Sequence, residues 1–532
     1  MQIEFLLHKY KYFPYEKNLA KKELKSLFGK KLTSTSKGFL LDNYPDFFQK
    51  ALRTTYFQQA ITDDGKIIIP QQALLEASAN GGLKELRPGI FEPPILKRQS
   101  TRYSAHGLHE YRGKFNPQIV RAIGNYLHLK PGSWILDPFC GSGTTILEAA
   151  HFGCNAVGVE INPLGVEISN AKISTLKIKY AQLQTDSQKL EESLIKRTRG
   201  LSFNTAFSKS MIENMVGSKW KSNLSNCDYL EKWFTESVLA QLALILIEIE
   251  NIKNRYSKKI FQVILSNVLR EVSLQDPGDL RIRRRKDFYK NIPAVSIFLK
   301  NLRLRVETIR KAKRVLKENK GFQQAFLGDI KTDFLSLNKM NFKNKFDAAI
   351  TSPPYVTALP YIDTQRLSLA LLGLIKSDEI RKTEKTLIGN REITNKEREE
   401  LENEIKNNDF KIPNDCLSLC QKLFSAINGD DGFRRKNVPA LSYKYFKEMG
   451  MMFENVRNTL KIGAPFVLVV GYNKTKLGNK EFVINTPNLL VSVAQKYNFK
   501  LQEIINLETY RRFDIHQNNS IRSEKMIVLR KS

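Results

Sequence analysis

The chain has 532 residues, of which 42% are hydrophobic, and its 85 Lys and Arg exceed its 54 Asp and Glu to give a formal net charge of +31. This length predicts about three domains, and the apolar content is ample for sizeable cores. The excess of positive charge favours a polyphosphate partner. The N-terminus lacks the apolar segment of a secretion signal and the apolar runs are shorter than a membrane span, so no membrane association is expected.

The cysteines and histidines exclude two further classes of protein. The five cysteines contain no Cys-x-x-Cys pair and no framework typical of secreted proteins, which predicts reduced thiols in a cytoplasmic protein. The six histidines show no metal-ligand spacing, so no metal site is expected. His106 and His109 are interpreted as polar positions near the mouth of a cleft.

Residues 1–98 predict an α+β domain at the start of the chain. Gln2–Leu7 and Gly38–Leu41 have the apolar character of strands, and Lys17–Leu27 has that of a helix. A link containing several prolines, residues 87–94, follows.

The first motif is a strand followed by a glycine-rich loop and a helix. Trp134–Leu136 is a short apolar run behind a turn signal, which predicts a buried parallel strand. Gly141 and Gly143 allow the backbone to approach a ligand closely, and the helix predicted from Thr144 directs free N–H groups towards it. A second strand ends at Glu160, an acid that holds ribose hydroxyls in doubly wound sheets. This pattern indicates a nucleoside cofactor with a carboxylate, and the alternative is a tight turn without a ligand.

Residues 176–320 predict a mainly helical insertion. Ser237–Asn251 carries apolar residues over a face wide enough to be buried. A basic cluster follows a turn signal and indicates contact with phosphates, with a solvated loop as the alternative; its members are Arg281, Arg283, Arg284, Arg285 and Lys286. The basic run Arg303–Lys320 suits either a nucleic-acid backbone or ordinary helix packing.

The second motif follows another apolar run, Phe346–Ile350, and consists of Ser352, Pro353, Pro354 and Tyr355. Neither proline can donate a hydrogen bond within a sheet, so the strand must end there and its last carbonyls face the cleft. The Ser352 hydroxyl and the Pro353 carbonyl would accept both N–H bonds of an exocyclic amine and stabilise the positive charge that develops as the nitrogen attacks a methyl sulfonium. Tyr355 offers a ring on which an extruded base can stack. A Pro-Pro turn packed by a tyrosine is the alternative.

Together the two motifs resemble those of amino-group DNA methyltransferases that use S-adenosylmethionine. The form Ser-Pro-Pro-Tyr is similar to the cytosine-N4 branch, because adenine-N6 enzymes usually have Asp or Asn at the position of Ser352. The resemblance implies a doubly wound Rossmann-like α/β sheet and a flipped cytosine in duplex DNA as substrate. It also implies a cofactor pocket formed by Phe115, Pro117, Asp137, Phe139, Gly141, Gly143, Thr144, Glu160 and Asp329.

The order of the motifs differs from that of most cytosine-N4 enzymes, in which the Pro-Pro motif precedes the glycine loop. The methyltransferase core is therefore expected in two parts, 99–175 and 321–532, with a charged insertion at about 376–445. Of the two insertions we favour 176–320 for target recognition, because it holds the arginine cluster. A monomer or weak dimer is expected, and a restriction endonuclease acting on the same site is a further candidate partner.

Three alternative functions stay open. A tRNA guanine-N2 methyltransferase also places a mixed domain before its core, although Asp or Asn usually precedes its Pro-Pro-Tyr. Adenine-N6 methylation of DNA would keep the same fold. A nucleic-acid-binding protein with a vestigial pocket is the third alternative, and the intact set of pocket residues argues against it.

Overall fold

The computed structural model describes residues 2–532 except 30–31, 43–46, 112, 203–205, 277, 279–282, 286–291, 317, 319, 333–340, 357–361 and 509–522. Among the helices in these ranges, none has the length and apolar character needed to cross a membrane.

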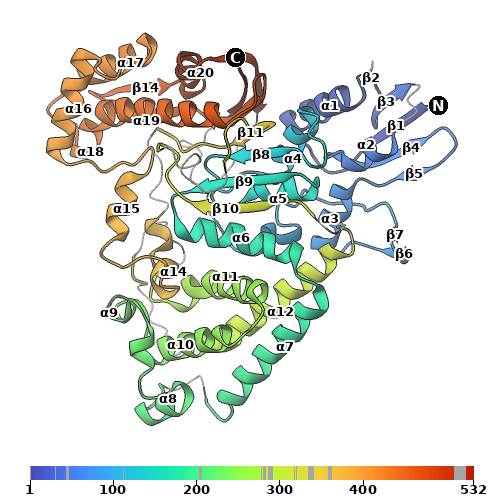
Figure 1. The fold of residues 1–532 in the computed structure, drawn as a ribbon, viewed down its shortest axis with the longest axis vertical. Helices are drawn as coiled ribbons and strands as arrows, with labels where there is room; N and C mark the ends of the chain where they lie inside the picture. The colour runs from blue at the N-terminus through green and yellow to red at the C-terminus, as the bar shows by residue number, and fades with distance from the viewer. Residues whose placement is uncertain are drawn as a thin grey trace.

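The first part of the chain forms an antiparallel sheet in the order β2-β3-β1-β4-β5, which lies beside α1 and α3 (Figure 1). The predicted strands and helix at the start of the chain are confirmed. The bounds are β1 Gln2–Leu7, α1 Pro14–Phe28, β2 Leu32–Ser34, β3 Gly38–Asp42, α2 Phe48–Arg53, β4 Phe57–Thr62, β5 Ile67–Ile68 and α3 Gln71–Asn80. A small hairpin, β6 Glu85–Arg87 and β7 Ile90–Phe91, follows, then the 3₁₀ turn η1 Ser104–Gly107.

The central sheet has seven strands in the order β10-β9-β8-β11-β12-β16-β15. The first five are parallel, and β16 is antiparallel to both of its neighbours. Their bounds are β8 Trp134–Asp137, β9 Asn155–Glu160, β10 Gln323–Leu327, β11 Ala348–Thr351, β12 Pro465–Gly471, β15 Phe499–Glu508 and β16 Ser523–Lys531. Strand order reverses beside β8, which is where open α/β sheets form their ligand crevice. The doubly wound Rossmann-like sheet expected from the sequence is confirmed.

Both faces of this sheet are buried, as β12 illustrates. Val467 and Val469 pack in the apolar cluster that includes the first domain and residues of α4 (Pro117–Tyr126) and α5 (Thr144–His151). Leu468 and Val470 pack in the cluster on the opposite face. Successive side chains of a strand point to opposite faces, so a run of consecutive apolar residues produces a strand buried on both sides.

Helices α7 to α12 gather on the outer side of α6 (Pro163–Lys177), as Figure 1 shows in green. They share one apolar core with α6, so the helical character predicted for residues 176–320 is confirmed where the structure describes them. Their bounds are α7 Tyr180–Arg197, α8 Lys209–Val216, η2 Trp220–Asn223, α9 Cys227–Leu230, α10 Glu236–Glu250, α11 Arg255–Val272 and α12 Ala294–Lys313. Helix α12 begins nine residues before the basic run Arg303–Lys320 and ends within it.

The third cluster of helices lies over the far end of the sheet. Its core is built on α19, whose bounds are Val438–Thr459, and on α17 and α20. The elements in this part are α16 Asn395–Asn407, α17 Asn414–Ser425, α18 Phe433–Lys436, β13 Asn473–Leu477, β14 Lys480–Ile484 and α20 Thr486–Lys496. Before them come η3 Asp363–Gln365, α14 Arg366–Leu371 and α15 Ile380–Thr386, and the buried apolar residues of α14 and α15 belong to the core of α6 to α12.

Candidate active site

The glycine loop joins β8 to α5 at the carboxyl edge of the central sheet. Gly141 and Gly143 have positive φ of 49° and 75°, a conformation that side chains disfavour, which explains the two glycines. Gly143 is the N-cap of α5 and provides no side-chain cap. The hydroxyls of Ser142 and Thr144 are buried and have no hydrogen-bond partner in the described parts of the chain. Polar groups of this kind call for a polar ligand or water at the helix end.

One face of α6 holds the carbonyl groups of this loop. The Ser169 hydroxyl donates to the Gly141 carbonyl at 2.9 Å, and the Lys172 ammonium donates to the Ser142 carbonyl at 2.6 Å. At Gly165 a Cβ atom would lie 2.9 Å from the Gly141 oxygen, so only glycine allows this approach. Residues 165, 169 and 172 share one face of a helix, a signal that was present in the sequence but was missed.

Glu160 is connected to the loop at the end of β9. Its carboxylate accepts the N–H groups of Gly141 and Asn162, each at 2.8 Å. Each carboxylate oxygen keeps further acceptor capacity, so this geometry is compatible with the hydroxyl donors that the sequence predicted for Glu160. Burial raises the pKa of Glu160 to about 7, because the charged form loses hydration.

The structure brings the two motifs together through Asp137, the last residue of β8. Its Oδ1 accepts the Thr351 hydroxyl at 2.6 Å and the Phe139 N–H at 3.1 Å. Thr351 is the last residue of β11 and directly precedes Ser352. Asp137 is buried, which raises its pKa to about 6. The bond between Asp137 and Thr351 therefore fixes the position of the Pro-Pro motif relative to the glycine loop, a role for Thr351 that the sequence did not indicate.

The Ser-Pro-Pro-Tyr motif follows the end of β11, as its prolines predicted. The Tyr355 hydroxyl donates to Glu524 of β16 at 2.9 Å, and the Tyr445 hydroxyl of α19 donates to the Pro354 carbonyl at 3.0 Å. These two bonds anchor the motif to elements on both sides.

Asp329 lies two residues beyond the end of β10, at the same edge of the sheet. Its carboxylate accepts the Lys331 N–H at 2.9 Å, and the Lys331 ammonium lies 3.5 Å from it. Phe139 and Tyr355 are both partly buried and pack against the same apolar cluster. The predicted cofactor residues of β8, β9 and β10 thus share one edge of the sheet.

The cover segment, residues 109–118, lies across this edge. The Tyr111 ring lies 3.4 Å from the position that a Cβ of Gly141 would take. Phe115 and Pro117 line a cavity of about 990 Å³ that this segment shares with α11, α12 and η3. The segment is connected to α11, because His109 Nε2 lies 3.0 Å from the Ser266 hydroxyl and the Glu110 N–H donates to Asn267 at 2.8 Å.

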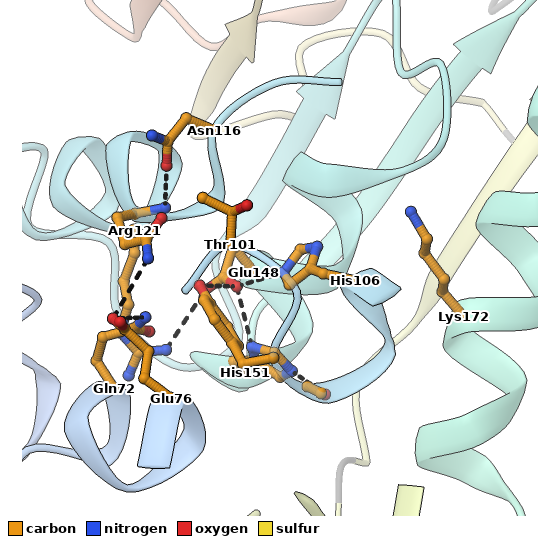
Figure 2. Close-up of polar contacts among 12 residues, drawn as sticks. Gln72, Glu76, Thr101, His106, Asn116, Arg121, Glu148, His151 and Lys172 are labelled. Atoms are coloured by element: carbon orange, nitrogen blue, oxygen red, sulfur yellow. Dashed lines mark hydrogen bonds and ion pairs between the residues drawn. The ribbon is translucent and has the colours of Figure 1, made fainter. Parts of the chain in front are cut away.

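Glu148 of α5 is the centre of a buried polar network, drawn in Figure 2. Its Oε1 lies 2.8 Å from the Tyr103 hydroxyl, 2.7 Å from His106 Nε2 and 3.2 Å from His151 Nδ1. Arg121 reaches its Oε2 at 3.3 Å. Burial alone would raise the pKa of Glu148, but the charge and hydrogen bonds of His151 and His106 lower it well below its usual value.

This network concerns two expectations from the sequence, the position of His106 and His109 near a cleft mouth and the lack of a metal site. His106 and His109 line the cavity but are buried, which corrects their predicted place near its mouth. His106, Glu148 and His151 have ligand atoms close enough together for a metal ion. Tyr103 and Arg121 already satisfy the carboxylate, and the guanidinium would repel a cation. The network therefore holds η1 and α4 onto α5.

The basic cluster is only partly visible, since Arg281 and Lys286 lie outside the described residues. Arg284 donates to the Lys232 carbonyl at 2.6 Å. Arg285 donates to the carbonyls of Gln275, Arg270 and Glu271, and the last two belong to the final turn of α11. Arg283 is exposed. Two of the five predicted phosphate contacts thus bind backbone carbonyls in this structure.

Parts of this sequence are similar to those of known proteins. Residues 63–171, which include the cover segment and the glycine loop, match the N6 and N4 methyltransferase family model, described as DNA methylase. Over these residues the chain is similar to the N6 and N4 DNA methylases. It is 23% identical over 353 residues to the Type II methyltransferase M.MjaII of Methanocaldococcus jannaschii, covering 54% of this chain and 66% of that protein. It is 27% identical over 299 residues to the Type II methyltransferase M.BsoBI of Geobacillus stearothermophilus, covering 53% of this chain and 56% of that protein.

A shorter similarity concerns an RNA-modifying enzyme. The chain is 30% identical over 107 residues to the tRNA (guanine(10)-N2)-dimethyltransferase of Methanothermobacter thermautotrophicus, covering 19% of this chain and 32% of that protein. The chain thus spans only 56 to 66% of the length of the two Type II relatives and a third of the tRNA enzyme.

Proposed function

We propose that this chain is an S-adenosylmethionine-dependent methyltransferase that transfers a methyl group to the N4 amine of a cytosine flipped out of duplex DNA. The observation that carries the proposal is the bond between Asp137 and Thr351, because it places Ser-Pro-Pro-Tyr beside the glycine loop. The match to the DNA methylase family supports DNA as the substrate.

The residues of the glycine loop fit this cofactor. The unpartnered hydroxyls of Ser142 and Thr144 lie at the N-terminus of α5, which suits a carboxylate. The Glu160 carboxylate would accept hydrogen bonds from the ribose hydroxyls of the cofactor, and the Asp329 carboxylate would accept one from its adenine amine. Phe115, Pro117 and Phe139 would supply apolar contacts. When bound, S-adenosylmethionine supplies an electrophilic methyl group on a sulfonium.

The second motif would hold the amine that is methylated. The Pro354 carbonyl already accepts a hydrogen bond from the Tyr445 hydroxyl. The Ser352 hydroxyl and the Pro353 carbonyl would therefore accept the two N–H groups of the substrate amine. Accepting both bonds moves the nitrogen towards tetrahedral geometry and stabilises its developing positive charge. The Tyr355 ring would stack on the extruded base while its hydroxyl stays bonded to Glu524.

Serine at position 352 favours cytosine N4 over adenine N6, because adenine-N6 enzymes of the family that the chain resembles usually have Asp or Asn at this position. The test is transfer of labelled methyl from S-adenosylmethionine to duplex DNA and to bulk tRNA, followed by digestion and mass identification of the nucleoside. We expect N4-methylcytosine in DNA, and we expect Ser352→Ala to abolish it. Detection of N6-methyladenine in DNA would show that the target base is adenine and not cytosine. Label in tRNA alone would refute duplex DNA as the substrate.

The tRNA guanine-N2 reaction is the second candidate, and the similarity of 107 residues to a tRNA dimethyltransferase supports it. The longer similarity to Type II methyltransferases, over 353 and 299 residues, makes DNA the first choice. We further propose that the helical insertion contacts the target sequence, since its helices α11 and α12 border the cavity beside the cover segment.

A further inference from the structure

The cavity beneath the cover segment connects the candidate active site to the helical insertion. Tyr111, which lies over Gly141, is part of its lining, as is Gln365 of η3. Gln365 accepts from the Asn162 side chain at 2.6 Å, just after Glu160. Arg305 of α12 and Ser266 of α11 also line it. A volume of about 990 Å³ lies at the upper end of the range for small-ligand sites, so it is large enough for a nucleotide.

Positive charge dominates the lining, with five Lys and Arg side chains against two glutamates. Most of these cations already have partners. Arg102 forms an ion pair with Glu110 at 2.8 Å, and Lys114 donates to the carbonyls of Thr101 and His106. The carbonyl contacts of Arg285 have been described above.

Arg305 differs from these cations. The described residues give it no ion pair or hydrogen bond, and its Nε is buried without a partner. Burial and the nearby charge of Arg102 lower its pKa, but a guanidinium remains charged in proteins. The charge of Glu110 also acts on Arg305, but Glu110 forms its ion pair with Arg102. A half-buried guanidinium whose donors are unused is unfavourable, and a phosphate would accept two parallel hydrogen bonds from it.

A neighbouring residue on the same helix provides the contrast. Arg303 lies two positions before Arg305, is exposed, and pairs with Glu191 of α7 at 3.1 Å from its Nε. It does not line the cavity. The two arginines have equal charge, but of the two only Arg305 lines the cavity, whose lining also includes Tyr111 beside Gly141.

We propose that Arg305 binds a backbone phosphate of the DNA strand that presents its base to Ser352–Tyr355. The proposal rests on the function proposed above and adds a residue of the insertion to it. This contact supplies affinity and orientation but no sequence choice. In this proposal Arg305 takes the place of Arg285 as a phosphate contact of the insertion, because Arg285 donates its hydrogen bonds to backbone carbonyls.

The test measures binding of the full chain to a fluorescent DNA duplex at several salt concentrations, with Arg305→Ala, Arg305→Lys and the control Arg303→Ala. For Arg305→Ala we expect Kd to rise roughly tenfold to a hundredfold, as for loss of a charged hydrogen bond. We expect the slope of log K against log salt to become smaller by about 0.9, the value for one phosphate. Arg305→Lys should keep the slope and lose part of the affinity, and Arg303→Ala should resemble the wild type.

Three results would overturn this inference. Equal losses in Arg303→Ala and Arg305→Ala would show a diffuse charge effect. A weaker binding of S-adenosylmethionine by Arg305→Ala in calorimetry, with unchanged DNA binding, would show that the anion is the cofactor carboxylate. A change in binding to labelled tRNA alone would show that the phosphate belongs to RNA. If wild-type protein methylates DNA while the slope is unchanged in Arg305→Ala, only the phosphate site fails, whereas absence of methyl transfer to DNA refutes the proposed function itself.

Discussion

Gly165→Ala tests whether α6 sets the shape of the cofactor loop. In a helix interior this change stabilises by about 0.8–1.0 kcal/mol through helix propensity, and Gly165 lies in the first turn, where the gain is smaller. The new Cβ would lie 2.8 Å from Glu160 Cγ and 2.9 Å from the Gly141 carbonyl oxygen. Overpacking of this kind costs about 1–3 kcal/mol, so a net destabilisation of up to about 3 kcal/mol is expected.

The larger effect of Gly165→Ala should be on the cofactor. Displacing Glu160 or Gly141 weakens the charged hydrogen bonds of that carboxylate, which are worth about 1.5–3 kcal/mol each. This loss corresponds to a roughly tenfold to hundredfold rise in the Kd of S-adenosylmethionine. Isothermal calorimetry measures the Kd, and urea unfolding measures the stability.

A matched control is Gly450→Ala in α19. Its Cβ would lie 2.8 Å from the Tyr497 hydroxyl, so it is also overpacked, but it lies far from the glycine loop in the chain and on a helix whose apolar cluster contains no residue of α6. We expect it to lose stability and to bind the cofactor normally. If Gly165→Ala binds S-adenosylmethionine within twofold of the wild type while losing as much stability as Gly450→Ala, the role assigned to α6 is wrong.

Three further predictions concern single side chains. Thr351→Val leaves buried Asp137 without its hydroxyl donor and should cost about 1–3 kcal/mol in urea unfolding, with methyl transfer reduced more than cofactor affinity; an unchanged kcat would contradict the coupling of the two motifs. Tyr355→Phe removes the bond to Glu524 but keeps the ring, so its kcat/KM should stay within a few-fold, whereas Tyr355→Ala should lose about 1–3 kcal/mol of base stacking. Because burial raises the pKa of Glu160 to about 7 and hydroxyl donors prefer the ionised carboxylate, cofactor affinity should increase as pH rises from 6 to 8; Glu160→Gln should give a flat profile in calorimetry, and a wild-type profile in that variant would assign the titration to another group.

The sequence predicted the parts of the site that depend on local geometry. Positive φ at Gly141 and Gly143 requires residues without a Cβ, and two prolines cannot continue a central strand, so both loops could be read from their own residues. The apolar runs of β8, β9 and β12 likewise predict strands buried on both faces. The fold class follows from these strands and the helices between them.

Contacts between distant segments could not be predicted in this way. The basic cluster indicated phosphate binding, yet Arg284 binds the Lys232 carbonyl, and Arg285 binds carbonyls at the end of α11, which offers unsatisfied acceptors. His106 looked like a polar residue near a cleft mouth, and its burial depends on Glu148 of a helix 42 positions away.

The amino-acid sequence by itself determined the backbone conformation of the two motifs and the alternation of strands and helices, because these depend on neighbours along the chain. Only the tertiary structure decided that Thr351 bonds to Asp137, that Lys172 and Ser169 hold the loop carbonyls, and that Arg285 but not Arg305 spends its donors on backbone carbonyls among the described residues. A side chain's partner depends on which strands pair and which helices pack, and that arrangement minimises the free energy of the whole chain rather than of any segment.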